Sequence, residues 1–472
     1  MNPQFTRRTL LLAAAAAAAS VLAGCAGAPA ADLPPPIVFM HGNGDSAALW
    51  ITTLWRFESN GWPRERLHAV DVPYPQARDD DTKPQNGRSS AAENRRALAA
   101  EIDRVLAATG AKQVVLIANS RGGNAVRDYI ANFSGPGGGV AKVSHAILGG
   151  TPNHGVWADA AVRPSSEFNG AGPFLMGLNN VLAMNGMEVT PGPKWLTIRS
   201  DNNDKYAQPD GVWIGSGGTP TNVSFDGPAL KGAENVVIAG IDHRETAFGP
   251  KAFEAMFRFL TGKPPVSLKV ATEARVVLGG KLSGYGVGNQ NGTAPSNLPM
   301  AGATVEVYAT NPASGERLGP AVHRKLTGDD GQWGPFAADA QARYEFVISA
   351  NGYATTHIYR SPFPRSSNIV NLRAERLADA DQGAASVVTL TRPRGYFGLP
   401  RDSISLDGQS PPPGVPPGTA GVSISKLKLT DGAAGVAGGA GRAVAGEFNG
   451  ERIVGRAWPV ANNEVVLLEL TD

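Results

Sequence analysis

Cysteine is almost absent from this chain of 472 residues, which contains one, Cys25. A single cysteine permits neither an intramolecular disulfide nor a metal site made of several thiolates. The 58 glycines and 36 prolines follow no period, and the hydrophobic content of 42% is that of a folded protein, so collagen-like and disordered classes are excluded. At about 150 residues per domain, the length predicts two or more domains.

Charged residues are also few, at 18% of the chain, and the two signs nearly cancel, with 43 Lys and Arg against 41 Asp and Glu. Nucleic-acid binding requires Lys and Arg clustered where they can face phosphates. We therefore expect no nucleic-acid partner.

The amino terminus has the features of an export signal. Arg7 and Arg8 precede an uncharged run over 10–23, which is typical of a secretory signal and too short to span a bilayer comfortably. A twin arginine at this place indicates a bacterial twin-arginine route. The run ends in Leu-Ala-Gly-Cys, which resembles the bacterial lipobox. This resemblance implies a signal peptide over 1–24 and lipidation at Cys25, hence a membrane-anchored periplasmic or cell-surface protein; an ordinary cleavage site and a secreted protein are the alternative.

From residue 31 to 262, apolar strands alternate with amphipathic helices. Continuous apolar runs are typical of strands buried on both faces of a parallel sheet. Ser90 and Glu93 form a capping box that opens a helix, and Gly110 ends it. This alternation predicts an α/β fold with a mostly parallel sheet covered by helices on both faces. The expected strands are 37–40, 68–72, 113–118, 143–148, 196–199 and 236–239.

Ser120 follows one of these strands and precedes an expected helix. Its neighbours two positions away are Ala118 and Gly122, both small. A nucleophilic serine on a sharp strand-to-helix turn requires small residues at these positions, because larger side chains would clash across the turn. The pattern is A-x-S-x-G rather than G-x-S-x-G, a variant typical of one group of bacterial lipases. Ser120 is therefore the candidate nucleophile.

The first strand runs into His41, Gly42, Asn43 and Gly44. This turn resembles the His-Gly loop of lipases and esterases. The resemblance implies an oxyanion hole formed by the backbone N–H groups of Asn43 and Arg121, which would stabilise the developing negative charge.

His243 is the candidate general base because it follows the last expected strand and precedes the terminal helix of the α/β region. The acid that orients the histidine is expected in the loop after the strand at 196–199. Asp204 is favoured there, Asp201 is its rival, and Asp210 and Asp242 remain further candidates. We expect no metal and no cofactor.

Between 153 and 193 the chain is longer than a simple crossover requires, which predicts a lid-like insertion facing the substrate. After about residue 266 the helical period disappears and strand-like alternation appears, as in Val305 and Val307. The segments 301–308 and 327–333 resemble a transthyretin-like or carboxypeptidase-regulatory β-sandwich. We therefore expect an all-β domain over 266–472.

Taken together, residues 31–262 resemble the bacterial α/β-hydrolase lipases and esterases, and the added β domain is similar to that of a two-domain archaeal lipase. The resemblance implies hydrolysis of carboxylic esters through an acyl-enzyme on Ser120, with an ester, lipid or polyester as substrate. An aliphatic polyester depolymerase, of polyhydroxyalkanoate type, is the first alternative. The second is a surface binding protein with an inactive hydrolase domain.

Overall fold

The computed structural model describes residues 33–133, 138–180, 185–208, 218, 220–288, 295–430 and 440–471. The described residues from Pro36 onward belong to one compact unit. The expected signal peptide over 1–24 and the lipidation site at Cys25 lie outside the described residues. Within the described part, no helix has the length and apolarity needed to cross a membrane.

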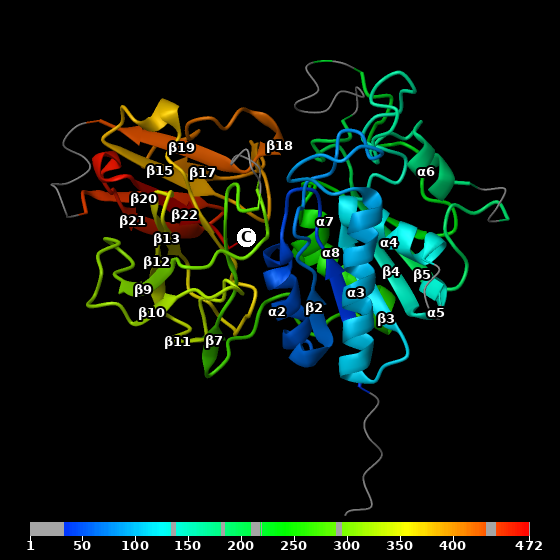
Figure 1. Cartoon of the computed structure of the whole chain (residues 1–472), viewed down its shortest axis with the longest axis horizontal. Helices are drawn as coiled ribbons and strands as arrows, with labels where there is room; N and C mark the ends of the chain where they lie inside the picture. Colours follow the sequence, from blue (N-terminus) through cyan, green and yellow to red (C-terminus); the bar gives the residue numbers. More distant parts are fainter. Residues whose placement is uncertain are drawn as a thin grey trace, which may run out of the picture. The chain divides into compact units, whose positions relative to one another are not determined.

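Residues 36–261, the α/β part, are built on a six-stranded sheet with the order β2-β1-β3-β4-β5-β6, visible in Figure 1. Every pair of neighbouring strands in it is parallel, as the sequence predicted. Its strands are β1 (Ile37–Met40), β2 (Leu67–Ala69), β3 (Val114–Asn119), β4 (Val143–Gly149), β5 (Lys194–Ser200) and β6 (Glu234–Ile238).

Helices cover both faces of this sheet because alternate strand residues point in opposite directions. Val38 and Met40 of β1 join a core with residues of α3 and α4, whereas Ile37 and Phe39 join a second core with residues of α2 and α8. The helices of this part are α2 (Ile51–Ser59), α3 (Ala91–Thr109), α4 (Arg121–Asn132), α5 (Gly138–Ala141), α6 (Pro173–Leu178), α7 (Glu245–Phe248) and α8 (Pro250–Thr261), with short 3-10 turns at Ala47–Trp50 and Arg64–Arg66.

The expected ends of α3 are confirmed. The Ser90 side chain accepts a hydrogen bond from the Glu93 N–H, and the Glu93 side chain bonds the Ser90 N–H in return. Gly110 ends the helix with φ of 66°, a conformation that glycine adopts without steric cost. The helix α2 was not predicted from the sequence.

Residues 276–471, the β part, contain strands and short 3-10 turns in their described stretches. Their largest sheet has seven strands in the order β10-β9-β12-β13-β22-β15-β19. The strands are β7 (Val276–Leu278), β8 (Leu282–Gly284), β9 (Thr304–Thr310), β10 (His323–Leu326), β11 (Phe336–Ala338), β12 (Arg343–Ser349), β13 (Thr355–Arg360), β14 (Leu372–Ala374), β15 (Ser386–Thr391), β16 (Phe397–Leu399), β17 (Ile404–Leu406), β18 (Gly418–Val422), β19 (Ile424–Leu429), β20 (Ala443–Phe448), β21 (Glu451–Arg456) and β22 (Glu464–Glu469).

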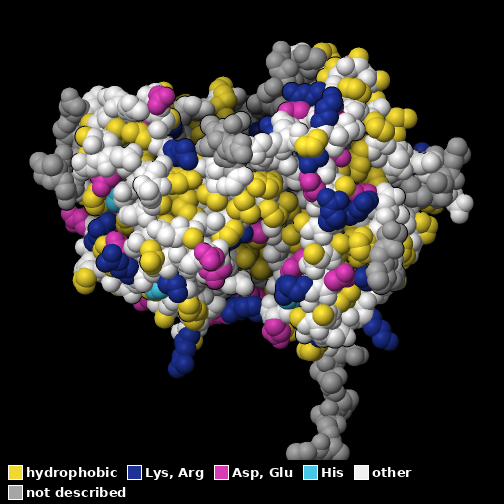
Figure 2. Space-filling view, in the orientation of Figure 1, with side chains coloured by type: hydrophobic (Ala, Val, Ile, Leu, Met, Phe, Trp, Pro, Cys, Tyr) yellow, Lys and Arg dark blue, Asp and Glu magenta, His cyan; other side chains and the backbone are white. Residues whose placement is uncertain are grey.

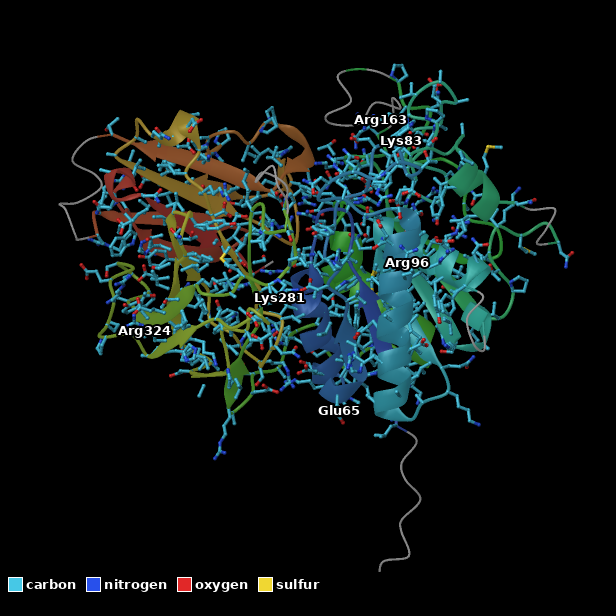
Figure 3. The ribbon with its side chains drawn as sticks, in the orientation of Figure 1. Glu65, Lys83, Arg96, Arg163, Lys281 and Arg324 are labelled. Atoms are coloured by element: carbon cyan, nitrogen blue, oxygen red, sulfur yellow. The ribbon has the colours of Figure 1, made fainter. Side chains whose placement is uncertain are left out.

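Polar contacts join the α/β part to the β part. The ammonium of Lys281 lies 2.8 Å from a carboxylate oxygen of Asp71, and Lys281 is labelled in Figure 3. The indole N–H of Trp55 donates to the Ser366 carbonyl at 3.0 Å. On the face shown in Figure 2, basic and acidic side chains are scattered among one another and among hydrophobic ones.

Candidate active site

Ser120 occupies the turn between β3 and α4. Its backbone has φ of 53° and ψ of −125°, a conformation that costs a non-glycine residue about 1–3 kcal/mol. Two hydrogen bonds hold the turn: the Ser120 N–H donates to the Gly149 carbonyl at 2.8 Å, and the Gly123 N–H donates to the Ser120 carbonyl at 2.9 Å. This geometry is that of a nucleophile elbow, in which the serine side chain is presented at the end of a strand.

Small residues beside Ser120 are a steric requirement of this turn. A Cβ on Gly122 would lie 2.5 Å from the Met40 carbonyl oxygen and 2.6 Å from that of His41. Such contacts are far inside van der Waals range, and the atoms met are backbone, which cannot rotate away. Ala118, two residues before the serine, is fully buried. The small-residue pattern read from the sequence therefore corresponds to a tight packing of β3 and α4 against β1.

His243 and Asp204 come together from two different loops. The Nδ1 atom of His243 lies 2.7 Å from Oδ2 of Asp204, and both residues are buried. The Tyr206 N–H donates to the other Asp204 oxygen at 2.9 Å, and the Tyr206 ring stands edge-on to the imidazole at 4.7 Å between centroids. With Nδ1 held by a carboxylate, Nε2 of the neutral ring is the basic nitrogen.

The other aspartates proposed from the sequence have different partners. Asp201 accepts the Gly240 N–H at 3.0 Å and so ties its loop to the turn after β6. Asp242 is fully buried and bonded to the guanidinium of Arg392 at 2.6 Å. Asp210 lies outside the described residues. Among the described aspartates, Asp204 is the one hydrogen-bonded to His243.

The two proposed oxyanion donors come from different segments near Ser120. Arg121 is the first residue of α4, where backbone N–H groups lack helical partners and carry partial positive charge. Asn43 follows Gly42, and a Cβ on Gly42 would lie 3.0 Å from the Ser120 Cβ, so this loop closely approaches the serine. The Asn43 side chain accepts the Ala77 N–H at 2.7 Å, which fixes the loop.

Two side chains that hold segments around Ser120 in place were not singled out as functional from the sequence. The Nε2 atom of buried His41 accepts the Val72 N–H at 3.1 Å, so Nδ1 carries the proton and donates to the Gly42 carbonyl at 2.8 Å. Burial lowers the pKa of His41, which keeps this tautomer neutral.

The guanidinium of Arg121 is the second of these supports. It is buried and bonds Oε1 of Glu167 at 2.8 Å as well as the Pro75 and Ser89 carbonyls. Burial raises the pKa of Glu167, and the charge of Arg121 opposes that rise. A residue expected to contribute its backbone N–H thus also fixes three segments with its side chain.

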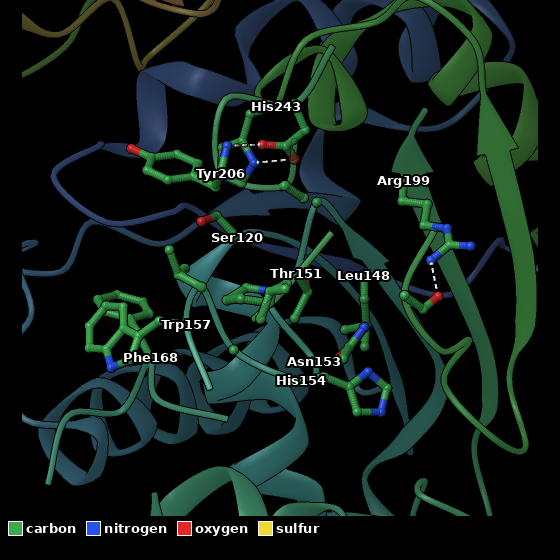
Figure 4. Close-up of a pocket in the computed structure, with 18 of the residues that line it drawn as sticks. Ser120, Leu148, Thr151, Asn153, His154, Trp157, Phe168, Arg199, Tyr206 and His243 are labelled. Atoms are coloured by element: carbon green, nitrogen blue, oxygen red, sulfur yellow. Dashed lines mark hydrogen bonds and ion pairs between the residues drawn. The ribbon is translucent and has the colours of Figure 1, made fainter. Parts of the chain in front are cut away.

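A pocket of about 660 Å³ opens beside these groups, and Ser120, Asp204 and His243 all line it. Trp157 and Phe168, which come from the expected insertion over 153–193, line the same pocket as Ser120, and all three are labelled in Figure 4. The helix α6, from later in that insertion, does not line this pocket, and its Met176 is 60% exposed. Further apolar lining comes from Leu148, Val156, Ile198, Val223, Phe225 and Leu230.

In the stretches that the structure describes, no group of three or more His, Cys, Asp or Glu side chains is placed to hold a metal ion. The residues around Ser120 instead provide a hydroxyl, an imidazole, a carboxylate and backbone N–H groups, which suffice for acyl transfer.

Comparison with known proteins gives two family matches. Residues 35–172 match the model of the alpha/beta hydrolase fold, and residues 274–377 match that of the lipase C-terminal domain. No match was found among curated proteins.

Solved structures similar to the chain include lipases and a phospholipase. A Bacillus licheniformis lipase in its mature form is 20% identical, with coverage of 49% of this chain and 94% of that one at a TM-score of 0.34. The propeptide form of the same lipase is 16% identical over 90% of this chain and 93% of that one, at 0.35. A Legionella pneumophila phospholipase is 13% identical over 73% and 96%, at 0.32.

The expected fold class is confirmed by the parallel sheet and by the first family match. The segments that led to the β-sandwich expectation, 301–308 and 327–333, fall within the second match. The chain therefore carries an α/β-hydrolase domain followed by a β-strand-rich domain, and the second family match is to the C-terminal domain of lipases.

Proposed function

We propose that this protein hydrolyses carboxylic esters with an apolar acyl chain, through an acyl-enzyme on Ser120. The observation that carries the proposal is the meeting of three parts at one pocket: a serine in an elbow conformation, a buried histidine and a carboxylate 2.7 Å from that histidine. Serine is a weak nucleophile until a base removes its proton, and an imidazole oriented by a carboxylate is the usual base.

The proposed reaction has two halves. His243 Nε2 accepts the proton of the Ser120 hydroxyl as Oγ attacks the ester carbonyl carbon, and the negative charge that forms on the carbonyl oxygen is stabilised by the N–H groups of Asn43 and Arg121. The imidazolium then gives its proton to the departing alcohol, leaving the acyl group on Ser120. Water, activated by His243, attacks the acyl-enzyme and releases the acid. Asp204 keeps Nδ1 protonated throughout and stabilises the imidazolium.

The apolar side chains of the pocket support an acyl chain as its occupant. Trp157, Phe168, Ile198 and Phe225 line the pocket with Ser120 and would bury hydrocarbon, which is worth about 0.8 kcal/mol for each methylene removed from water. The ester carbonyl of the substrate would then lie beside the Ser120 hydroxyl. This orientation suits a lipid ester and also an aliphatic polyester.

Covalent labelling with a fluorophosphonate tests the enzyme proposal directly. We expect the purified protein to be labelled, and Ser120→Ala to be unlabelled while keeping its fold. Ser224→Ala is the matched control, because Ser224 also lines the pocket and should not affect labelling. A folded protein that resists labelling would favour the binding-protein alternative instead.

Substrate class is tested by comparing three substrates with one enzyme preparation. Nitrophenyl esters of graded chain length report the preferred acyl length, while emulsified triglyceride and polyester film separate a lipase from a depolymerase. We expect the kcat/KM to rise with chain length until the apolar wall is filled. A preference for acetyl esters over all longer chains would contradict the proposed use of the pocket.

We also propose that the chain is exported and attached to a membrane through Cys25, on the strength of the twin arginine and the Leu-Ala-Gly-Cys sequence. Mass spectrometry of the processed amino terminus checks this proposal. Processing beyond Cys25, with no lipid, would leave a secreted hydrolase.

A further inference from the structure

The segment between β15 and β16 of the β part lies against the turn that carries His243. Arg392 donates from Nη1 to Oδ2 of Asp242 at 2.6 Å and from Nη2 to Oε1 of Glu245 at 2.7 Å. Arg392 is 2% exposed and Asp242 is fully buried. One guanidinium, 150 residues away in the sequence from Asp242, therefore binds both carboxylates that flank the His243–Arg244 dipeptide.

Asp242 gives shape to that turn. Its Oδ1 accepts the N–H groups of Arg244 at 2.8 Å and Glu245 at 2.9 Å, which caps the start of α7. Its Oδ2 accepts the Tyr396 N–H at 2.9 Å in addition to the Arg392 bond. A buried carboxylate requires a compensating positive charge, and in this network Arg392 is the closest one.

The same segment also reaches the loop that carries Asp204. The aromatic ring of Tyr396 lies 4.5 Å from the ammonium of Lys205 and 4.8 Å from the guanidinium of Arg244. The side chains of Tyr396 and Tyr206 are hydrogen-bonded, and Tyr206 stands edge-on to His243. Tyr396 also lines the pocket, together with Ser120 and His243.

Strand β18 of the β part also contacts the loop that carries Asp204. The Lys205 ammonium donates to the Gly421 carbonyl of β18 at 3.0 Å, and the Asn203 side chain accepts the Ala420 N–H at 3.2 Å. The residues on both sides of Asp204 are thus attached to the β part.

We propose that Arg392 and Tyr396 are positioning residues of the hydrolase site, so that the β part completes the active site instead of serving only as a separate substrate-binding module. Arg392 holds the turn that carries His243, and Tyr396 holds the loop that carries Asp204. The inference rests on the proposed function, because the position of His243 affects the rate only if His243 takes the proton of Ser120. A displacement of about 1 Å at a reacting group can cost on the order of 100-fold in rate, so a small relaxation of either loop would be measurable.

Chemical rescue provides the test. In Arg392→Ala the guanidinium is removed and a matching space remains, so we expect kcat for a short nitrophenyl ester to fall on the order of 100-fold with KM changed less than about threefold. Millimolar guanidinium, added as a free ion well below denaturing concentrations, should restore activity on the order of tenfold by binding Asp242 and Glu245. Guanidinium should not change the wild-type rate.

Arg442→Ala is the matched control, since Arg442 bonds Asp407 at an exposed site of the same β part. We expect that variant to keep the wild-type kcat and to show no rescue. Equal losses in Arg392→Ala and Arg442→Ala, or a loss in folded Arg392→Ala that guanidinium does not reverse, would overturn the proposal.

A second variant covers the case in which Arg392→Ala does not fold. Arg392→Lys keeps the charge but cannot reach both carboxylates with a planar fork, so a folded Arg392→Lys should lose about tenfold in kcat. An unchanged kcat in that variant would overturn the positioning proposal. Fluorophosphonate labelling keeps the two proposals distinguishable: an unlabelled wild type contradicts the proposed function, whereas a labelled wild type with equally fast labelling of Arg392→Lys contradicts only this inference.

Discussion

Among the described residues, two buried histidines form a hydrogen bond of the same length with a carboxylate, one in each part. In the α/β part, Nδ1 of His243 lies 2.7 Å from Asp204; in the β part, Nδ1 of His357 lies 2.7 Å from Glu345. The histidines are 5% and 2% exposed. Judged by this hydrogen bond alone, the two pairs are equivalent.

Their surroundings differ. His243 lines a pocket of about 660 Å³ with Ser120. His357 stacks on the indole of Trp458 at 4.1 Å between centroids, and Glu345 is bonded to Arg317 at 2.6 Å as well. The second pair is thus enclosed between β12 and β13 as part of the packing. Of these two pairs, the first is the one beside a serine and an open pocket, and these are the features on which the proposed function depends.

The largest expected difference concerns the two histidines. His243→Ala should lower kcat on the order of 10⁴-fold or more, because no other group can take the Ser120 proton, whereas His357→Gln should leave kcat within about twofold. Both are measured with a nitrophenyl ester on protein shown to be folded by circular dichroism. Comparable losses in the two variants would mean that the first pair is structural too.

The next comparison concerns the acid. Asp204→Ala should lower kcat on the order of 10³- to 10⁴-fold, because His243 would lose the partner that sets its tautomer. Asp201→Ala removes the bond to the Gly240 N–H and should cost only a few-fold. The two variants are compared by kcat under saturating ester. The reverse ranking would identify Asp201 as the acid and would show that the loop rearranges when substrate binds.

The second pair should affect the stability of the folded protein without affecting kcat. Glu345→Gln leaves Arg317 and His357 without a buried counter-charge and should lower the free energy of unfolding by about 3–5 kcal/mol, with kcat unchanged. Burial alone would raise the pKa of Glu345, but hydrogen bonds from His357 and Arg317 hold the pKa below its usual value. The stabilisation is therefore present above pH about 4.5 and is lost as the pH falls further.

Urea unfolding at pH 7 and pH 4 measures this effect. The gap between wild type and Glu345→Gln should narrow at the lower pH, because Glu345 of the unfolded chain takes up a proton below about pH 4.5 while the folded carboxylate still resists protonation. A gap that is independent of pH would mean that Glu345 contributes through packing and not through its charge.

The parts of the site that depend on local sequence were predictable. Ser120, with Ala118 and Gly122 around it, was found from a pattern of five residues, although the atoms that a Cβ on Gly122 would meet belong to Met40 and His41. Asp204 was favoured over Asp201, but the sequence did not decide between them because both lie in one loop. Their side chains bond to different residues far along the chain, Asp204 to His243 and Asp201 to Gly240.

The helix α2 was missed for a physical reason. Its Leu54 and Phe57 pack in the core beneath the parallel sheet, whereas its Ile51 and Trp55 pack in a core of the β part. The helix is short, and its polar residues Thr52, Thr53 and Arg56 are buried together with the apolar ones, so the polarity of a residue does not indicate which side of the helix faces solvent. The bond between Arg392 and Asp242 was equally inaccessible, since 150 residues separate its partners.

The smallest expected effect comes from a half-buried carboxylate that has no histidine partner. Glu375 lines a second cavity, of about 460 Å³, and burial raises its pKa to about 7, with the charges of Arg373 and Lys426 opposing the rise. In the unfolded chain its pKa is near 4.5. Between these values the folded protein holds a proton that the unfolded chain releases, so this group's contribution to stability falls as the pH rises from about 4.5 to about 7.

Glu375→Gln removes that dependence, because glutamine stays neutral at every pH. We expect the variant to be more stable than wild type by about 1–2 kcal/mol at pH 8 and nearly equal to it at pH 5, measured by urea unfolding. Glu447→Gln is the control, since Glu447 is exposed and paired with Arg452 at 3.0 Å, and its difference from wild type should not change with pH. Equal differences for Glu375→Gln at both pH values would place its carboxylate in contact with water.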